Sequence, residues 1–261
     1  MKIICLTEES VEFFYDIGRE DVVSAVSVYA VRPKTLKPLH ELPRVSAFTK
    51  ANIDKIVQMR PDLVIGYSDV QKNIAHDLVD HGVNVLITHQ RTLSEIYQSL
   101  ILFSSIIGER EKGQEYVKYL QNIVRETEEK ARAFKFKPKV YFEEWDGPRI
   151  LASPWIHEII EICGGHSLLK ERSLESHKSL RRQISDQELI SANPDLILFS
   201  WCGKKGDPDQ FLKHDDLAQV KAVLNKQVIE ISSDIILQPG PAAIKDGIPL
   251  IFKLIQAMQP T

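Results

Sequence analysis

The chain has 261 residues, of which 43% are hydrophobic and 26% are charged, and its formal net charge is −3. These values are typical of a globular protein. They exclude a disordered chain, which would have fewer hydrophobic residues, and a strongly basic nucleic-acid binder. The length allows one large domain or two of about 130 residues, and either could bury a core.

The first part of the chain alternates strand patterns with helix patterns. Short apolar or β-branched runs predict strands at residues 2–6, 22–28, 62–67 and 83–88. Amphipathic stretches predict helices at residues 10–17, 53–59 and 74–80. Thr92 and Glu95 have the spacing of a capping box, which predicts the start of another helix. This alternation favours a mostly parallel sheet that is covered by helices.

A long helix is predicted next, because residues 109–134 are rich in Glu, Lys and Gln and contain no proline. It would be about 39 Å long at about 1.5 Å per residue. The alternation then resumes, with strands predicted at 140–143, 195–200 and 227–231 and helices at 155–163, 186–192 and from about 243 onward. We therefore expect an N-terminal α/β lobe at residues 1–107, an interlobe helix at 108–137 and a C-terminal α/β lobe at 138–261.

The two halves repeat each other. A helix followed by Pro-Asp-Leu and an apolar strand occurs at Pro61 and again at Pro194, 133 residues later. In addition, a glutamate precedes a glycine by six residues both at Gly18 and at Gly164. A Pro-Asp-Leu turn also recurs by chance in α/β proteins, but two separate elements repeat here in the same order. The repeat indicates two similar lobes, and ligands of such proteins bind between domains or beyond the carboxyl ends of strands.

In order and spacing, these segments resemble the periplasmic binding proteins of the cobalamin and iron–siderophore type, also called helical-backbone metal receptors. The resemblance covers nearly the whole chain. It implies two Rossmann-like lobes with mostly parallel sheets, joined by one long helix (class III), and one ligand between the lobes. A cobalamin-binding branch is nearest, and its marks here are Glu143-Glu-Trp-Asp146, Ser200-Trp-Cys-Gly-Lys204 and Leu237-Gln-Pro-Gly-Pro-Ala242.

The resemblance also implies ligand-binding residues for a corrinoid such as cobalamin. Aromatic faces suit a flat corrin ring, and those expected in the two lobes are Tyr29, Phe48, Tyr67, Trp145, Trp155 and Trp201. Tyr29, Phe48 and Tyr67 could each instead be core or strand-cap residues, and Trp155, at the start of a helix, could instead be a core residue. Polar candidates are Asp234, which matches a family position that meets corrin amides, and Gln238, Asp146 and Ser153. The family often has arginine where this chain has Ala242, which disfavours a strongly anionic ligand.

Two departures from exported members concern transport. Those members carry one acidic residue on each lobe that docks onto arginines of an ABC permease, and the corresponding residues here are Asp54 and the uncharged Gln187, next to Glu188. Met1 and Lys2 lead into an apolar run too short for a signal peptide, and three cysteines cannot all pair in disulfides. We therefore expect a monomeric cytoplasmic binding protein that holds its ligand without export, contacts no nucleic acid and has no membrane insertion.

Three alternatives stay open. The chain could be the substrate-binding component of an ABC importer for an iron chelate or another metal chelate. It could be a chelatase-like enzyme whose metal-handling residues are His157 with Glu158 or Glu161, or His166. It could also be an enzyme built on Cys202, with Lys204 or Lys205 lowering the pKa of the thiol. The family resemblance favours binding without catalysis. The eight histidines show no tight ligand spacing, so we expect no metal site made by the protein alone.

Overall fold

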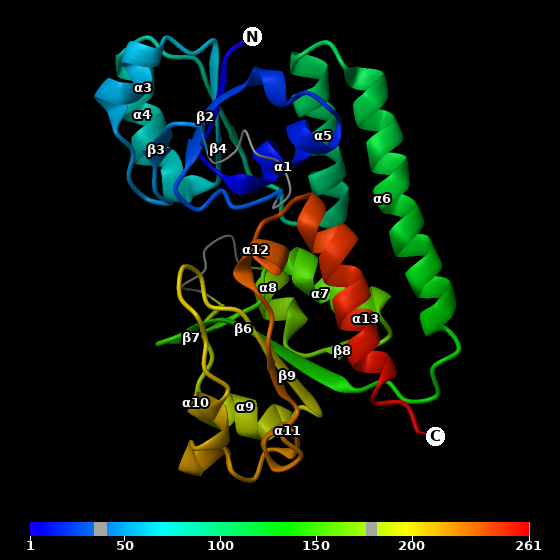
Figure 1. Ribbon diagram of the computed structural model, residues 1–261. Helices are drawn as coiled ribbons and strands as arrows, with labels where there is room; N and C mark the ends of the chain where they lie inside the picture. Colours follow the sequence, from blue (N-terminus) through cyan, green and yellow to red (C-terminus); the bar gives the residue numbers. More distant parts are fainter. Residues whose placement is uncertain (34–40, 176–181, 261) are drawn as a thin grey trace. The chain divides into compact units, whose positions relative to one another are not determined.

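The computed structural model describes residues 1–33, 41–175 and 182–260 (Figure 1). The chain divides into two compact units. The first consists of Met1–Tyr119 with Pro239–Pro241, and the second of Leu120–Gln238 with Ala242–Thr261. Each unit contains one sheet with helices on both faces, so each is described by itself.

The first unit has a five-stranded sheet in the order β3-β2-β1-β4-β5, and every neighbouring pair is parallel. Its strands are β1 (Ile3–Cys5), β2 (Val23–Ser27), β3 (Arg44–Ser46), β4 (Leu63–Tyr67) and β5 (Val85–Thr88). The short strand β3 was not predicted. Because all five strands run the same way, their carboxyl ends form one edge of the sheet.

Helices α1 (Glu8–Asp16) and α5 (Leu93–Ile106) cover one face of this sheet, and α3 (Ile53–Met59) and α4 (Lys72–Asp80) cover the other (Figure 1). Phe13, Phe14 and Phe103 pack between α1 and α5, with ring centroids about 6 Å apart. The predicted capping box at the start of α5 is confirmed: Thr92 Oγ1 accepts from the Glu95 amide, and Glu95 accepts from the Thr92 amide.

Helix α6 (Arg110–Ala131) contains the division between the two units, at Tyr119 and Leu120. The second unit has a sheet in the order β10-β9-β6-β7, in which β8 also pairs with β6. Its strands are β6 (Lys139–Asp146), β7 (Arg149–Leu151), β8 (His166–Ser167), β9 (Leu196–Phe199) and β10 (Val228–Glu230). Strand β7 was not predicted and is antiparallel to β6, so this sheet is mixed.

Helices again cover both faces of the second sheet (Figure 1). One face carries α7 (Pro154–Ile162) and α13 (Ile248–Gln256), which follows a π-helical turn, η5 (Ala243–Gly247). Around the other face lie α9 (Asp186–Ala192), α10 (Asp209–Leu212), η4 (Asp215–Leu217) and α11 (Lys221–Leu224). Tyr141, Phe199, Trp201 and Phe211 form part of the core on that side. Helices α8 (Lys170–Glu175) and α12 (Ser233–Ile236) complete the unit. The predicted α/β class with mostly parallel sheets is confirmed.

The internal repeat is also a structural repeat. The N-cap residues of α3 and α9 are Asn52 and Ser185, 133 residues apart, and each side chain accepts from the amide three residues later. Both helices end on a left-handed residue, Arg60 with φ +49° and Asn193 with φ +44°. A proline follows each of them, so the helix stops at the same point in both units.

The aspartates of the two Pro-Asp-Leu turns have one shared function. Asp62 Oδ2 accepts from the Lys2 amide at 2.6 Å, immediately before β1. Asp195 Oδ2 accepts from the Lys139 amide at 2.9 Å, at the start of β6. Each aspartate therefore joins the turn to the first residues of a central strand, which explains the repeated motif.

Among the residues that the structure describes, no helix combines the length and the apolar character needed to cross a membrane.

Candidate functional site

The predicted aromatic residues of the first unit lie at the carboxyl edge of its sheet. Tyr29 follows β2 by two residues, Phe48 follows β3 by two residues, and Tyr67 is the last residue of β4. The ring of Tyr29 is on the surface, since the residue is 48% exposed, and Phe48 and Tyr67 are half-buried. Parallel strands bring these three residues to one edge, where α/β proteins bind ligands. Their role in ligand binding stays a prediction.

Tyr67 is held in place by its neighbours. Its hydroxyl donates to the Gln90 carbonyl at 3.1 Å, and its amide donates to Gln71 Oε1 at 2.9 Å. Its ring stacks on the exposed imidazole of His89, with centroids 6.2 Å apart and planes 18° apart. Sequence reasoning did not single out His89 as a candidate. The available signal was its position directly after β5, at the same edge of the sheet.

Two buried glutamates follow β1 at this edge. Glu8 Oε1 accepts from the Val31 and Arg32 amides, each at 2.6 Å. Glu9 Oε1 accepts from the Thr7 hydroxyl at 2.6 Å, whereas Glu9 Oε2 is buried and has no hydrogen-bond partner among the described residues. Burial raises the pKa of Glu9 to about 7. This carboxyl therefore titrates near neutral pH.

The Pro-Gly-Pro segment at residues 239–241 packs on the same part of the first unit. The Pro239 carbonyl accepts from Gln90 Nε2 at 3.1 Å. A Cβ atom placed on Gly240 would lie 2.4 Å from Glu9 Cβ, so no larger residue fits without movement of the backbone. The glycine of this motif is thus required by close packing.

The three tryptophans of the second unit have different environments. Trp145 is half-buried, and the Lys204 ammonium lies 5.1 Å from its ring centroid. Trp155 is 4% exposed and donates to the Ile236 carbonyl at 3.2 Å. Trp201 is 1% exposed and donates to Glu143 Oε1 at 3.2 Å. The structure therefore places Trp155 and Trp201 in the interior, where they pack and donate hydrogen bonds. Trp201 also lines a pocket of this unit. The role of both tryptophans in ligand binding stays a prediction.

The polar candidates of the second unit are more accessible. Asp234 lies on α12, just after β10, is half-buried and accepts from the Ser232 hydroxyl. Gln238 is half-buried directly before the Pro-Gly-Pro segment. Ser153 is buried, and its amide donates to Glu144 Oε1 at 2.5 Å. The side chain of Asp146 lies outside the described part of the chain. Asp234 follows the carboxyl end of a strand, and the role of these polar residues in ligand binding stays a prediction.

Two of the motifs that carried the resemblance meet in one buried network. Glu143 is fully buried, and it accepts from the Tyr141 hydroxyl at 2.9 Å, from Arg149 Nη1 at 2.8 Å and from Trp201 Nε1. Burial raises the pKa of Glu143 despite the nearby guanidinium. Glu144 pairs with Arg182 at 2.8 Å. These residues stabilise the second unit and join its strands to the segment after β9.

The chemistry required by the enzyme alternatives is not supported at these residues. Desolvation and then the charge of Glu144 raise the pKa of the Cys202 thiol, which does not support the alternative of a thiol activated by lysine. Burial and then Arg182 lower the pKa of His157 to about 4, and His157 Nδ1 lies 2.7 Å from the Ser167 hydroxyl. His166 pairs with Lys139, at the amino end of β6, and thus lies at the opposite edge from the ligand side of the sheet.

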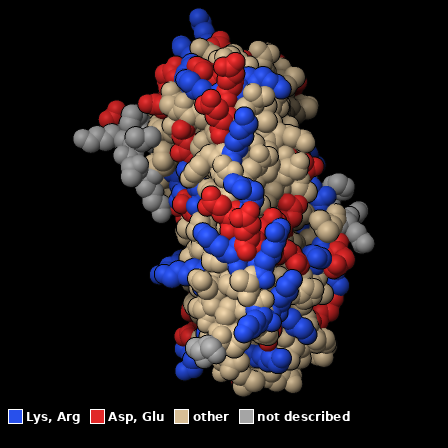
Figure 2. All heavy atoms as spheres, turned by 90° about the vertical axis from the view of Figure 1, so that its right-hand side faces the viewer, with Lys and Arg blue, Asp and Glu red and all other residues tan. Residues whose placement is uncertain are grey.

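Charged side chains of both signs are interspersed on the face of the molecule in Figure 2.

A model of the periplasmic binding protein family matches residues 3–235. The chain belongs to this family. The vitamin B12-binding protein of Vibrio cholerae serotype O1 is 23% identical over 248 residues, which cover 93% of this chain and 85% of that protein.

Solved structures agree with this assignment. The periplasmic vitamin B12 binding protein BtuF of Vibrio cholerae has a TM-score of 0.76 at 22% identity, covering 98% of this chain and 96% of that chain. A periplasmic heme binding protein from Pseudomonas aeruginosa has a TM-score of 0.83 at 17% identity, covering 99% of this chain and 94% of that chain. At these identities the likeness establishes the fold, and it confirms the predicted class III architecture.

For a periplasmic binding protein, the two expected docking positions are of interest. Asp54 and Gln187 are both exposed and both lie two residues after the N-cap, on α3 and α9. The neighbouring Glu188 is already engaged, because it caps α9 through Ser185 and pairs with Arg172. The hydrogen bond from Arg172, and then the hydrogen bond from the Ser185 amide, lower the pKa of Glu188 to about 2. Glu188 is therefore a poor substitute for an acidic residue at position 187.

Proposed function

We propose that this protein is a non-catalytic binding protein for a corrinoid such as cobalamin. The observation that carries the proposal is the aromatic edge of the first unit, where Tyr29, Phe48 and Tyr67 follow three parallel strands. A corrin ring is broad and nearly flat, and aromatic faces bind such a surface at low entropic cost. The relatives named as vitamin B12-binding proteins support the same class of ligand.

The second unit supports a ligand that is rich in amides. Asp234 and Gln238 are half-buried polar residues, and they offer an acceptor and an amide to the side chains of a corrinoid. Ala242 stands where a family arginine would bind carboxylates, and it is fully buried. This donor set favours a neutral, amide-rich ligand over an anionic chelate.

The test is a parallel titration of the purified protein with cobalamin, cobinamide and haemin, followed by calorimetry and by the visible spectrum of each ligand. We expect micromolar or tighter binding of cobalamin. Each tyrosine ring should contribute roughly 100 Å² of apolar contact with the ligand. Tyr29→Ala and Tyr67→Ala remove this contact and should each weaken cobalamin binding about 10- to 50-fold.

Tyr119→Ala is the matched control, because this tyrosine is 51% exposed on α6, away from the strand ends. Cobalamin binding that is absent, or that is insensitive to both site variants, would overturn the corrinoid proposal. Preference for cobinamide would place the lower nucleotide of cobalamin outside the site.

Haem is the second candidate ligand, because of the stacked pair formed by Tyr67 and His89. An exposed imidazole beside a tyrosine can supply an axial ligand to iron. Solved relatives named as heme-binding proteins support this alternative, which includes an importer for iron chelates. Tighter binding of haemin than of cobalamin, with a Soret band that changes in His89→Ala, would favour it.

We also propose that the protein acts in the cytoplasm and does not deliver its ligand to a permease. The uncharged Gln187 at an expected docking position supports this proposal. Recovery of the native, full-length protein in the periplasmic fraction would overturn it. Ligand uptake that depends on this protein and on Asp54 would overturn it as well.

A further inference from the structure

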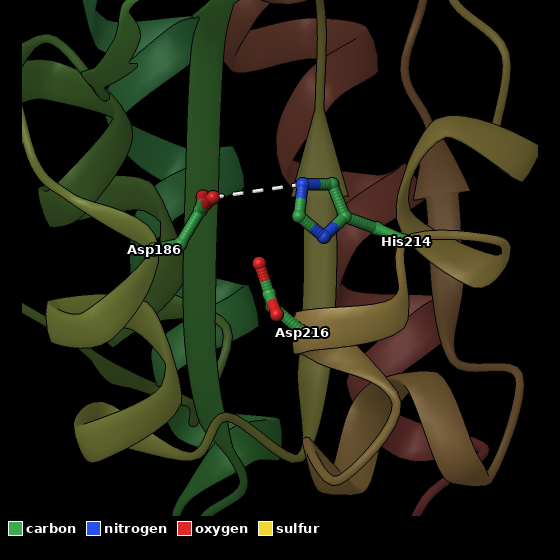
Figure 3. A group of neighbouring side chains, drawn as sticks. All are labelled: Asp186, His214 and Asp216. Carbon is green, nitrogen blue, oxygen red and sulfur yellow. Dashed lines mark ion pairs between the residues drawn. The ribbon is translucent and has the colours of Figure 1, made fainter.

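A second group of polar side chains lies within the second unit, between the start of α9 and the turn η4 (Figure 3). Asp186 is the first residue of α9, His214 is the residue directly before η4, and Asp216 lies in η4. One possible metal-binding atom from each residue lies within 4.8 Å of the other two. His214 Nε2 is 3.5 Å from Asp186 Oδ2. Two segments that are distant in the sequence thus bring an imidazole and two carboxylates together.

Asp186 is held in a defined orientation by a neighbouring arginine. Arg149 Nε donates to Asp186 Oδ1 at 2.5 Å, which leaves Oδ2 facing His214. Arg149 is fixed in turn by the buried carboxylate of Glu143, at 2.8 Å. Hydrogen-bonded carboxylates of this kind are typical of metal sites, where outer contacts orient the ligands. Arg149 pairs with Glu143 and Asp186, and the carboxylate of Asp216 lies beside Asp186, so a cation would offset the negative charge of this group.

The imidazole of His214 is not committed to another partner among the described residues. Its Nδ1 atom is buried and has no hydrogen-bond partner there. Its Nε2 atom lies 3.5 Å from Asp186 Oδ2, which is long for a hydrogen bond. A buried unsatisfied ring nitrogen requires an explanation, and an ion is one of the ordinary ones.

The group borders a pocket of about 380 Å³, which is lined by Arg149, Asp186, Trp201, Phe211 and His214 among others. Trp201 follows β9 and Arg149 begins β7 just after β6, so the pocket lies at the carboxyl ends of two parallel strands. Sheets of this class bind ligands at that edge. Space therefore exists beside the three donors for water or a small ligand.

We propose that Asp186, His214 and Asp216 bind a divalent transition-metal ion. Imidazole and carboxylate together suit Zn²⁺, Mn²⁺ or Fe²⁺, and three protein ligands leave coordination positions open toward the pocket. Metal–ligand bonds of about 2.0–2.2 Å require donors at most about 4.4 Å apart. Rotation of the exposed Asp216 side chain can bring its carboxylate oxygen within this distance of the other two donor atoms. The site lies within one unit, and none of its three proposed ligands is among the candidate corrinoid-binding residues.

The test uses the full chain without a histidine tag, stripped of metal and titrated with Zn²⁺ by calorimetry. We expect one Zn²⁺ per chain, bound at least 10-fold more weakly by His214→Ala and by Asp216→Asn. Co²⁺ should give visible absorption bands that both variants lose. His76→Ala is the matched control, because His76 also lies 3.5 and 3.6 Å from two aspartates, but is exposed on α4.

Three outcomes would overturn the proposal: no binding of Zn²⁺, equal binding by both site variants and the wild type, or an equal loss in His76→Ala. If circular dichroism shows that His214→Ala does not fold, the Zn²⁺ titration of Asp216→Asn decides the test. Asp216 is exposed, so its substitution should leave the fold intact. Cobalamin titration of the same variants should be unchanged. The metal site and the corrinoid site can therefore fail separately.

Discussion

The buried carboxyl of Glu9 should make the stability of the protein depend on pH. Glu9 is 1% exposed, and burial raises its pKa from 4.5 to about 7. Between these two values the folded protein keeps a proton on Glu9 that the unfolded chain releases. The free energy of unfolding should therefore fall as pH rises from about 4.5 to 7, and then stay constant. The total loss attributable to Glu9 is about 3 kcal/mol.

Glu9→Gln should remove this dependence, because glutamine mimics the neutral carboxyl. The variant and the wild type should have similar stability near pH 5, and the variant should be more stable by about 3 kcal/mol at pH 8. Urea unfolding followed by circular dichroism measures the difference, since all three tryptophans lie in the second unit.

Glu8→Gln is the matched control for a buried acidic residue. The Glu8 carboxylate accepts two backbone N–H groups at 2.6 Å, and bonds to a charged acceptor are worth about 1.5–3 kcal/mol. This variant should therefore be less stable at pH 8, the opposite sign from Glu9→Gln. A constant difference between Glu9→Gln and the wild type from pH 5 to pH 8 would refute the reasoning.

Three further predictions concern the second unit and the helix caps. Burial lowers the pKa of His157 from 6.5 to about 4, so the free energy of unfolding of the wild type should fall by about 3 kcal/mol as pH drops from 6.5 to 4. His157→Gln should lose less stability over the same range, which urea unfolding at pH 4.5 and 7.5 would measure. Arg149→Met leaves the buried Glu143 without its guanidinium and should cost about 3–5 kcal/mol at pH 7 in the same assay, whereas adding Glu143→Gln should restore part of the loss. Ser185→Ala and Thr92→Ala should each cost about 1 kcal/mol, seen as a lower Tm; an unchanged Tm would contradict the assigned capping boxes.

The regular elements were largely predictable because their signals are local. The helices at 53–59 and 186–192 have the predicted bounds, since N-cap residues start them and the residue before a proline ends them. The strands β3, β7 and β8 were missed. Each has only two or three residues, too few to show a period, and β7 follows a turn that reverses the chain.

The site was predictable only in part. The positions of Tyr29 and Tyr67 followed from predicted strands, because residues after parallel strands share one edge. The position of Phe48 did not, because the strand before it, β3, was not predicted. The burial of Trp155 and Trp201 did not follow, because aromatic residues after a strand occur both in cores and in ligand sites. The electrostatic surroundings of Cys202 did not follow from the neighbouring lysines in the sequence, since the Lys204 ammonium lies over tryptophan rings and Glu144 is the charge that acts on the thiol.

The sequence by itself determined the family, the α/β class, the repeated helix–turn–strand units and the edge of the first sheet that carries the aromatic residues. These features depend on short-range patterns and on the direction of parallel strands. Only the tertiary structure decided which side chains are buried, which charges face them, and that Asp186, His214 and Asp216 meet. The physical reason is that tertiary packing decides which groups lose their water. Packing also brings Asp186 next to His214 and Asp216, which are 28 and 30 positions later in the chain, and no local pattern encodes either effect.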